Sequence, residues 1–283
     1  MIKKGLVLEG GAMRGLFTAG VMDVLMENGI SFDGAVGVSA GAAFGVNYKS
    51  RQIGRVLRYN TKFCSDKRYG GIGVLLKTGN LYSKDFCYGE VPLVHDVFDF
   101  SAYDKNPMEF YVVATDVENG RPVYHKYTGK EASGFEWIRA SASMPLVSEI
   151  VEIDGQKLLD GGVSDSVPLK FFQNMGYEKN VVILTQPKNY RKKVNKALPL
   201  IKLLYKKYPE FVKTAANRHI EYNNTLDYIM QEEKNGRVLA IRPYEALPIG
   251  RVEKDPEKLK VVYELGRKVA IDRLSEIKEF LKN

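Results

Sequence analysis

Ser39 stands in the pentapeptide Gly37-Val38-Ser39-Ala40-Gly41, and a serine between glycines at this spacing can act as a nucleophile. The pattern produces a sharp turn from a strand into a helix, which lifts the serine oxygen out of the sheet and aims the helix N-terminus at it. The alternative is a small residue in a tight turn. A nucleophile also needs a base and donors for a developing negative charge.

A glycine-rich segment could supply those donors. It follows the first apolar run and reads Gly10-Gly11-Ala12-Met13-Arg14-Gly15. Consecutive residues without bulky side chains allow several backbone N–H groups to converge on one oxygen, as acyl transfer requires. The segment matches neither of the two common glycine-rich phosphate-binding patterns, which argues against a nucleotide.

The base is not obvious, because the chain has three histidines: His95, His125 and His219. The order Ser39, Asp160, His219 is that of a conventional triad. However, only two strands can precede Ser39, whereas several precede the nucleophile in that fold. His219 also lies in a lysine-rich helical stretch, so we interpret it as a surface or packing residue and keep the serine–histidine hydrolase as an open alternative.

Asp160 is the carboxylate best placed to replace a histidine. It ends a short apolar strand and is followed by Gly161 and Gly162, which leave space for a partner group. A simple Asp-Gly turn is the alternative. A carboxylate is a weaker base than histidine, so the hypothesis requires a direct hydrogen bond to Ser39 and a partly desolvated site.

Length and composition favour one large α/β domain. The chain has 283 residues, of which 45% are hydrophobic and 27% charged. Two cysteines, Cys64 and Cys87, are too few for a disulfide scaffold and predict free thiols in a reducing compartment. Neither a secretory signal nor a transmembrane run is recognisable, so we expect a cytoplasmic protein. The net charge of +8 suits an anionic membrane, nucleic acid or an acidic substrate.

Strand and helix patterns alternate along the chain, which predicts a mainly parallel central sheet flanked by helices on both faces. Asn119-Gly120 and Asp154-Gly155 each separate two β-rich runs and predict hairpins. Strands are expected within 3–8, 32–39, 108–118, 121–128, 147–154, 156–160, 180–186 and 237–243, and helices over 14–28, 40–50, 134–144 (stopped by Pro145) and 256–281.

Two stretches leave alternatives open. Residues 64–100 mix glycines, aromatics and apolar residues without periodicity, which fits an irregular surface excursion or a mobile cover over an apolar cleft. Residues 188–213 are rich in lysine and contain a single acid, Glu210. They fit a solvated helical face or a basic amphipathic segment that contacts a membrane.

Taken together, the motifs resemble those of the patatin-like phospholipases, acyl hydrolases with a serine–aspartate dyad and a three-layer α/β/α fold. The likeness covers about residues 4–185 and includes the segment 139–145, Arg-Ala-Ser-Ala-Ser-Met-Pro. It implies that Ser39 is the nucleophile and Asp160 its base. The implied oxyanion hole consists of the N–H groups of Gly10, Gly11 and Ala12, with Arg14 bracing the loop; Gly15, Gly37, Gly41, Gly161 and Gly162 are the motif glycines.

Two departures from the family pattern concern the loop. Ala12 replaces the third glycine, which works only if its backbone avoids glycine-only conformations, and Glu9 stands where many members have aspartate. The expected organisation is a catalytic core over 1–187 and a C-terminal helical region over 188–283 packed on the same domain.

The resemblance implies a serine esterase that cleaves lipid acyl esters without a cofactor or metal. We expect a lipid substrate, peripheral contact with an anionic membrane and no nucleic-acid partner; the sequence leaves the oligomeric state open. The alternative from another class is a catalytically silent member that binds a lipid or a protein through the same scaffold.

Overall fold

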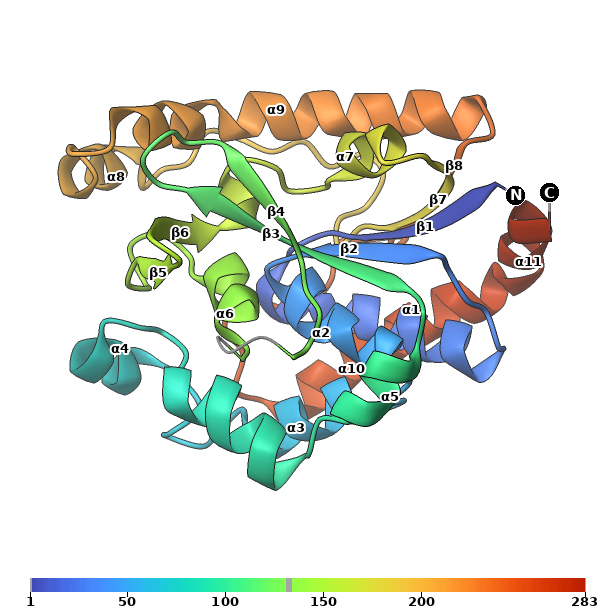
Figure 1. The fold of residues 1–283 in the computed structure, drawn as a ribbon, viewed down its shortest axis with the longest axis horizontal. Helices are drawn as coiled ribbons and strands as arrows, with labels where there is room; N and C mark the ends of the chain where they lie inside the picture. The colour runs from blue at the N-terminus through green and yellow to red at the C-terminus, as the bar shows by residue number, and fades with distance from the viewer. Residues whose placement is uncertain (1, 131–133, 283) are drawn as a thin grey trace.

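A computed structural model describes residues 2–130 and 134–282 as a central sheet with helices on both faces (Figure 1). Within these residues the sheet has eight strands, in the order β5-β6-β3-β2-β1-β7-β8 with β4 paired to β3. The strands are β1 (Lys3–Leu8), β2 (Gly34–Val38), β3 (Glu109–Asp116), β4 (Pro122–Lys126), β5 (Val151–Ile153), β6 (Gln156–Asp160), β7 (Tyr177–Ile183) and β8 (Val238–Ile241).

The predicted, mainly parallel sheet is confirmed. The pairs that join β3, β2, β1, β7 and β8 are parallel. The pairs β3–β4 and β5–β6 are the two predicted antiparallel hairpins, and β6 also runs antiparallel to β3. The carboxyl ends of β1, β2 and β7 therefore meet at one edge of the sheet, where α/β proteins bind their ligands.

Helices cover both faces, as expected (Figure 1). In the view of Figure 1, α7, α8 and α9 lie above the sheet, and α1, α2, α3 and α10 lie below it. The helices are α1 (Gly15–Glu27), α2 (Ala40–Lys49), α3 (Arg55–Phe63), α4 (Ile72–Thr78), α5 (Phe100–Lys105), α6 (Glu136–Ala142), α7 (Leu169–Asn174), α8 (Leu198–Leu204), α9 (Pro209–Lys234), α10 (Pro256–Asp272) and α11 (Leu274–Lys282), with the 3-10 turns η1 (Ala12–Arg14) and η3 (Gly161–Val163) and the π-helical η2 (Phe86–His95).

Alternate strand residues enter two apolar layers. Val7, Val36 and Val113 pack on the side of α7 and α9, whereas Leu8 and Val112 pack on the side of α1, α2 and α10. Because both faces are buried, the parallel strands are continuous apolar runs in the sequence.

Most predicted helices are present within a residue or two of their expected limits. The helix expected over 14–28 is α1, and Gly29 follows it with φ of +66°. The helix expected to stop at Pro145 already ends at Ala142. It ends early because Ser143 leaves the helix and its carbonyl accepts the N–H of Asp160 at 2.8 Å.

The prediction of one long helix over 256–281 was wrong, because the chain breaks at Arg273 into α10 and α11. The Arg273 guanidinium donates to the carbonyl of Ala240, in β8, at 2.6 Å and also pairs with Glu276. This anchor to the sheet fixes the position of the break, which periodicity in the sequence does not reveal.

Residues 64–100 are more ordered than the irregular excursion that was one of the two expectations. They contain the helix α4 and the π-helical η2. Tyr69, Tyr82 and Tyr88 from this stretch line an apolar cavity, as the alternative of a cover over a cleft requires. Whether the cover moves stays a prediction.

The C-terminal region is in close contact with the core through α10 and α1. A Cβ atom added to Gly266 would lie 2.0 Å from the carbonyl oxygen of Phe17, and one added to Gly20 would lie 2.1 Å from that of Tyr263. Tyr263 also donates to the buried Asp23 at 2.5 Å. We propose on this basis that residues 188–283 fold with residues 1–187 as one domain.

Gly266→Ala tests this proposal. The added methyl group overpacks the contact between α10 and α1, so we expect the free energy of unfolding of the whole chain to fall by about 1–3 kcal/mol. Chemical denaturation followed by circular dichroism should show one transition, shifted as a unit.

Gly73→Ala is the matched control, because a Cβ atom there meets nothing within 4 Å. Gly73 lies in α4, and its replacement by alanine should leave the stability of the fold unchanged or raise it by about 0.5 kcal/mol. Two separate transitions, of which Gly266→Ala shifts only one, would show that the C-terminal region folds independently.

Candidate active site

Ser39 lies between the end of β2 and the start of α2, in a strained turn. Its φ of +55° is in the left-handed region, which costs a residue with a side chain about 1–2 kcal/mol. Its carbonyl accepts the N–H groups of Ala42 and Ala43, so the first turn of α2 forms directly on it. The hydroxyl is thereby held at the N-terminus of α2, where the helix dipole favours negative charge.

The pentapeptide glycines are required by close contacts between backbones. A Cβ atom at Gly37 would lie 2.4 Å from the carbonyl oxygen of Gly41, and one at Gly41 would lie 2.4 Å from that of Leu8. Both distances are far below van der Waals contact. The spacing Gly-x-Ser-x-Gly therefore lets α2 begin directly against β1 and β2.

The register of β3 brings Asp160 to Ser39. Val38 pairs with Val113, and Asp160 pairs with the next residue, Ala114. The chain turns into Ser39 directly after Val38, so the serine and the aspartate meet at one point of β3. The hypothesis that these two residues lie together is supported by this geometry.

The Asp160 carboxyl is buried, with 6% of the residue exposed. Burial raises its pKa above the ordinary value, while the hydrogen-bonding interaction with the Ser39 hydroxyl, the charge of Arg218 and the N–H of Gly162 act in the opposite direction. The Gly162 N–H donates to one carboxylate oxygen at 2.7 Å. A desolvated carboxylate next to a hydroxyl is a stronger base than an exposed one.

The glycine-rich loop lies against this pair. A Cβ atom at Gly10 would lie 3.0 Å from the Cβ of Ser39, and one at Gly11 would lie 2.8 Å from the Thr185 hydroxyl. In the described part of the chain, the N–H groups of Gly10, Gly11 and Ala12 donate no hydrogen bond to another protein group. They are therefore available to an oxygen bound at Ser39.

Two expectations about the loop need correction. The expectation that the Ala12 backbone avoids the left-handed region favoured by glycine was wrong, because its φ is +49°. The loop carries the strain of this conformation. The Arg14 side chain forms no brace among the described residues: its guanidinium lines the cleft, and its Nε is buried without a hydrogen-bond partner. Gly15 allows contact with Ala40 and Phe44.

Ser141 and Glu9 are positioning residues whose roles the sequence did not reveal. Ser141 accepts the N–H of Ser39 at 2.8 Å and donates to the carbonyl of Val113 at 2.6 Å. Glu9 is buried and accepts from Thr185 and from Tyr222 of α9. The available signals were the small-residue segment that contains Ser141 and the unusual acid directly before the glycine loop.

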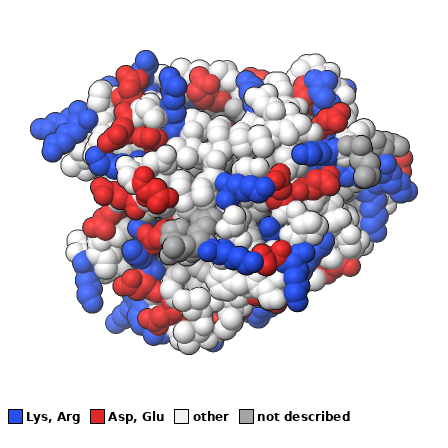
Figure 2. Space-filling model, in the orientation of Figure 1, with Lys and Arg blue, Asp and Glu red and all other residues white. Residues whose placement is uncertain are grey.

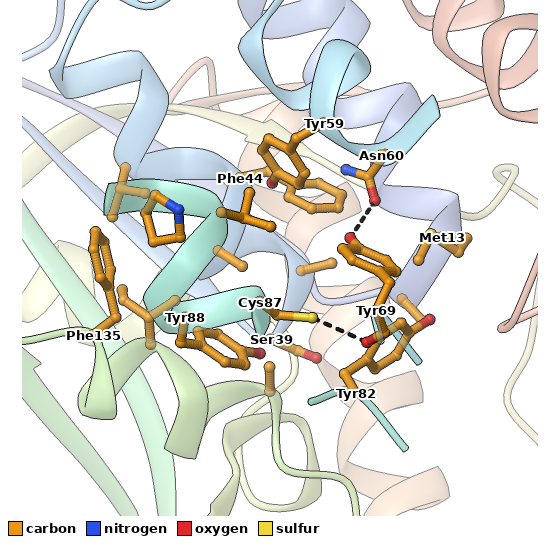
Figure 3. A pocket seen from close by; sticks show the side chains of 18 of the residues that line it. Met13, Ser39, Phe44, Tyr59, Asn60, Tyr69, Tyr82, Cys87, Tyr88 and Phe135 are labelled. Carbon is orange, nitrogen blue, oxygen red and sulfur yellow. Dashed lines mark hydrogen bonds between the residues drawn. The ribbon is translucent and has the colours of Figure 1, made fainter. Parts of the chain in front are cut away.

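Ser39 lies where two cavities meet. The first is lined mainly by aromatic and aliphatic side chains, and Figure 3 shows Ser39 among them. Tyr69 donates to Asn60 at 2.8 Å and the Cys87 thiol to the Tyr69 carbonyl at 3.1 Å (Figure 3), whereas the Tyr82 hydroxyl is buried without a hydrogen-bond partner among the described residues. The lining suits an apolar chain.

The second cavity has a volume of about 340 Å³, and its lining mixes charged and polar side chains with apolar ones such as Leu81, Leu146 and Ile201. Its walls include Ser39, Asp160 and the glycine loop together with four cationic side chains: Arg14, Lys192, Arg218 and Arg251. One serine hydroxyl thus faces both an apolar and a cationic compartment.

The histidines lie elsewhere. His219 is on α9 and its Nδ1 is 3.1 Å from the Ala216 carbonyl, while His125 stacks on Trp137 with ring centroids 3.9 Å apart. In the described residues, no histidine lines either cavity at Ser39, and no three His, Cys, Asp or Glu side chains gather as a metal site would require. The geometry therefore does not support the serine–histidine alternative.

Two family profiles match the chain. The family described as patatin-like phospholipase matches residues 6–172, and a domain of unknown function, DUF6363, matches residues 208–282. The second match falls within the C-terminal region that the motifs left unexplained.

The chain is also similar to curated proteins and to a solved structure. The uncharacterized protein YjjU of Escherichia coli K12 is 33% identical over 198 residues, which are 64% of this chain and 52% of that protein. Lysophospholipase nte1 of Aspergillus terreus is 31% identical over 183 residues, 61% of this chain and 11% of that protein. The chain thus spans about half the length of one curated relative and about a tenth of the other. The crystal structure of VipD from Legionella pneumophila aligns with a TM-score of 0.49 at 13% identity, covering 98% of this chain and 67% of that one.

The burial of Asp160 predicts how stability depends on pH. Because the pKa of Asp160 is raised in the folded protein, the wild type loses stability as the pH rises through that pKa and the carboxyl becomes charged. Asp160→Asn stays neutral, so we expect its Tm to exceed that of the wild type at neutral pH.

The difference in Tm should shrink as the pH falls toward the ordinary value of an aspartate, about 3.9. Differential scanning calorimetry across this range measures it. Asp85→Asn makes the same chemical change at an exposed position and serves as the control. A wild type more stable than Asp160→Asn at neutral pH would contradict the expectation.

Proposed function

Since the chain belongs to the patatin-like phospholipase family, we propose that it hydrolyses acyl esters of lipids, with Ser39 as nucleophile and Asp160 as base. The observation that carries the proposal is the position of Ser39, where an apolar cavity meets a cationic one. An amphiphilic ester matches this arrangement, because its carbonyl group lies between an apolar chain and a polar alcohol.

In the first half of the proposed reaction, Asp160 takes the proton of the Ser39 hydroxyl as its oxygen attacks the ester carbonyl. The N–H groups of Gly10, Gly11 and Ala12 bind the oxyanion of the tetrahedral intermediate. The intermediate collapses to an acyl-enzyme, and the leaving alcohol takes the proton from Asp160.

In the second half, Asp160 removes a proton from water as the water oxygen attacks the acyl-enzyme. The tetrahedral intermediate then collapses, the Ser39 oxygen takes the proton back from Asp160, and the fatty acid is released. The same carboxylate serves both halves because the other carboxylate that lines this cavity, Glu9, is occupied by hydrogen bonds from Thr185 and Tyr222. The raised pKa of Asp160 makes the carboxylate a better acceptor in both steps.

A fluorophosphonate probe tests the dyad directly. The wild type should gain one adduct by intact mass, because the Ser39 oxygen displaces fluoride from phosphorus. Ser39→Ala should gain none, and Asp160→Asn should react at least about 10⁴-fold more slowly, since the two residues act as a unit.

Labelling of Ser39→Ala at the wild-type rate would overturn the assignment of the nucleophile. A folded wild type that stays unlabelled, also in the presence of anionic vesicles, would favour the silent lipid- or protein-binding member of the same scaffold.

We also propose that the molecule contacts an anionic membrane at the end where α4 and α8 lie (Figure 1). Ile72 and Leu76 of α4 are 74% and 83% exposed, and Leu203 of α8 is 65% exposed. Leu81, just after α4, and Ile201, in α8, line the cavity of Ser39. The exposed apolar side chains therefore flank the route by which a lipid would reach the serine.

The charges at this end suit the same partner. Lys202, Lys206 and Lys207 are exposed in or just after α8, and Lys77 is exposed in α4. Figure 2 shows basic side chains projecting at the end where Figure 1 places α8. Lysines next to exposed leucines are typical of segments that lie on an anionic membrane, because the leucines enter the membrane while the ammonium groups stay at its surface. Among the described residues, no helix has the length and apolar composition to cross a membrane.

Leu76→Glu and Leu203→Glu test this contact. Each removes an apolar anchor and adds a negative charge, so each should weaken binding to vesicles of phosphatidylglycerol and phosphatidylcholine by roughly tenfold or more. Vesicle flotation measures the bound fraction.

Val261→Glu on α10 is the control, since Val261 is also exposed and α10 lies away from the end where α4 and α8 lie (Figure 1). Equal losses in all three variants, or no loss in the α4 and α8 variants, would contradict a contact at this end.

A further inference from the structure

The cationic cavity contains more positive charge than the protein itself neutralises. Its walls hold two acids, Glu9 and Asp160, among the described residues, against Arg14 and three cations of the C-terminal region. Glu9 is occupied by its bonds to Thr185 and Tyr222. The charge of Asp160 is offset by Arg218, whose Nε also donates to the Gly162 carbonyl.

Lys192 and Arg251 form no direct ion pair or side-chain hydrogen bond within residues 2–130 and 134–282. At longer range, the charge of Arg251 lowers the pKa of Asp160, and that of Glu9 raises the pKa of Lys192. The Lys192 ammonium lies 4.0 Å from the ring centroid of Tyr222 and faces the cavity. A desolvated ammonium without a carboxylate is unfavourable unless a ligand supplies negative charge.

Lys192 is also fixed in place before any ligand arrives. Its backbone N–H donates to the Asn223 side chain at 2.8 Å, and its carbonyl accepts from the same amide at 3.0 Å. Asn223 lies on the long helix α9, so the loop is tied to a rigid element. Preorganised cations bind an anion without the cost of ordering a loop.

Arg14 adds an independent observation. Its Nε is buried and lacks a hydrogen-bond partner among the described residues, although the rest of the residue reaches the cavity. A buried unsatisfied donor of a charged group is costly, and an anion in the cavity would satisfy it.

The titration of Lys192 is consistent with an excess of positive charge. Burial, together with the charges of Arg218, Arg14 and Arg251, lowers the pKa of Lys192 to about 7, while Glu9 acts in the opposite direction. An anion bound among these side chains would raise the pKa and restore full charge to the ammonium.

We propose that Arg14, Lys192 and Arg251 form a subsite for the phosphate group of a glycerophospholipid or lysophospholipid whose acyl ester lies at Ser39. The inference rests on the proposed acyl hydrolysis and assigns the residues that select a phosphate-bearing ester. The acyl chain enters the aromatic cavity, and the phosphate enters the cationic one. Guanidinium and ammonium groups are the usual partners of phosphate oxygens.

The subsite also gives a role to the C-terminal region. Lys192 and Arg251 both lie beyond the residues that match the patatin-like family, and Arg251 lies within the domain of unknown function. The catalytic core would then supply the chemistry, and the C-terminal region would select the headgroup.

The test compares two esters with the same acyl chain: a lysophosphatidylglycerol, which carries a phosphate, and a monoacylglycerol, which does not. The measured quantity is the ratio of their kcat/KM values. We expect the wild type to prefer the phosphate ester by at least about tenfold, and Lys192→Met and Arg251→Gln each to lower the ratio by roughly tenfold.

Lys268→Met is the control, because Lys268 is exposed on α10 and lines neither cavity. Arg251 is exposed too, so Arg251→Gln tests the subsite even if Lys192→Met fails to fold. A wild type that hydrolyses both esters equally, or a ratio that neither variant changes, would overturn the subsite. Hydrolysis of neither ester by a protein whose Ser39 is unlabelled would instead refute the proposed function.

A second arm separates a lipid headgroup from free phosphate. Calorimetric titration of Ser39→Ala with inorganic phosphate and with glycerophosphoglycerol measures both affinities. Tighter binding of glycerophosphoglycerol, weakened by Arg251→Gln, would support the headgroup assignment. Binding of inorganic phosphate alone, without discrimination between the two esters, would assign the cavity to free phosphate and overturn it.

Discussion

The register of a single strand determines the candidate site. Val38 and Asp160 pair with consecutive residues of β3, Val113 and Ala114, so two distant segments end at the same point. The carbonyl of Val113 accepts from Ser141, which in turn accepts the N–H of Ser39. Since a shift of one residue would turn every side chain of β3 to the other face, the apolar layers that fix the register also fix the distance between serine and aspartate.

The buried charges around that point are mutually dependent. In the proposed mechanism, Asp160 acts as a base because it is desolvated, and the charge of Arg218 and the N–H of Gly162 offset the cost of that desolvation. Arg218 belongs to α9, so the electrostatics of the core site depend on a helix outside the catalytic motifs. These charged groups form one network, in which Arg218 of the C-terminal region stabilises the carboxylate form of Asp160.

The sequence predicted the features that depend on local patterns. The strands around the two glycine motifs, both hairpins and α1 followed from periodicity and from turn residues such as Asn119-Gly120. It could not predict the break at Arg273, which depends on a bond to Ala240, nor the φ of Ala12, which depends on the packing of the loop. The placement of Ser39 beside Asp160 was inferred from motif order and the family resemblance, whereas Ser141 and the cations from residues 188–283 required tertiary contacts that no spacing in the sequence encodes.

The C-terminal region and the oxyanion loop are coupled through one carboxylate. Glu9 directly follows β1, accepts from Thr185 after β7 and from Tyr222 of α9, and directly precedes Gly10 and Gly11 of the loop that lies against Ser39. Tyr222 also supplies the ring under the Lys192 ammonium. A displacement of α9 would therefore move the loop donors and the unpaired cation together. The proposed headgroup subsite and the proposed oxyanion loop therefore share one support, the buried carboxylate of Glu9.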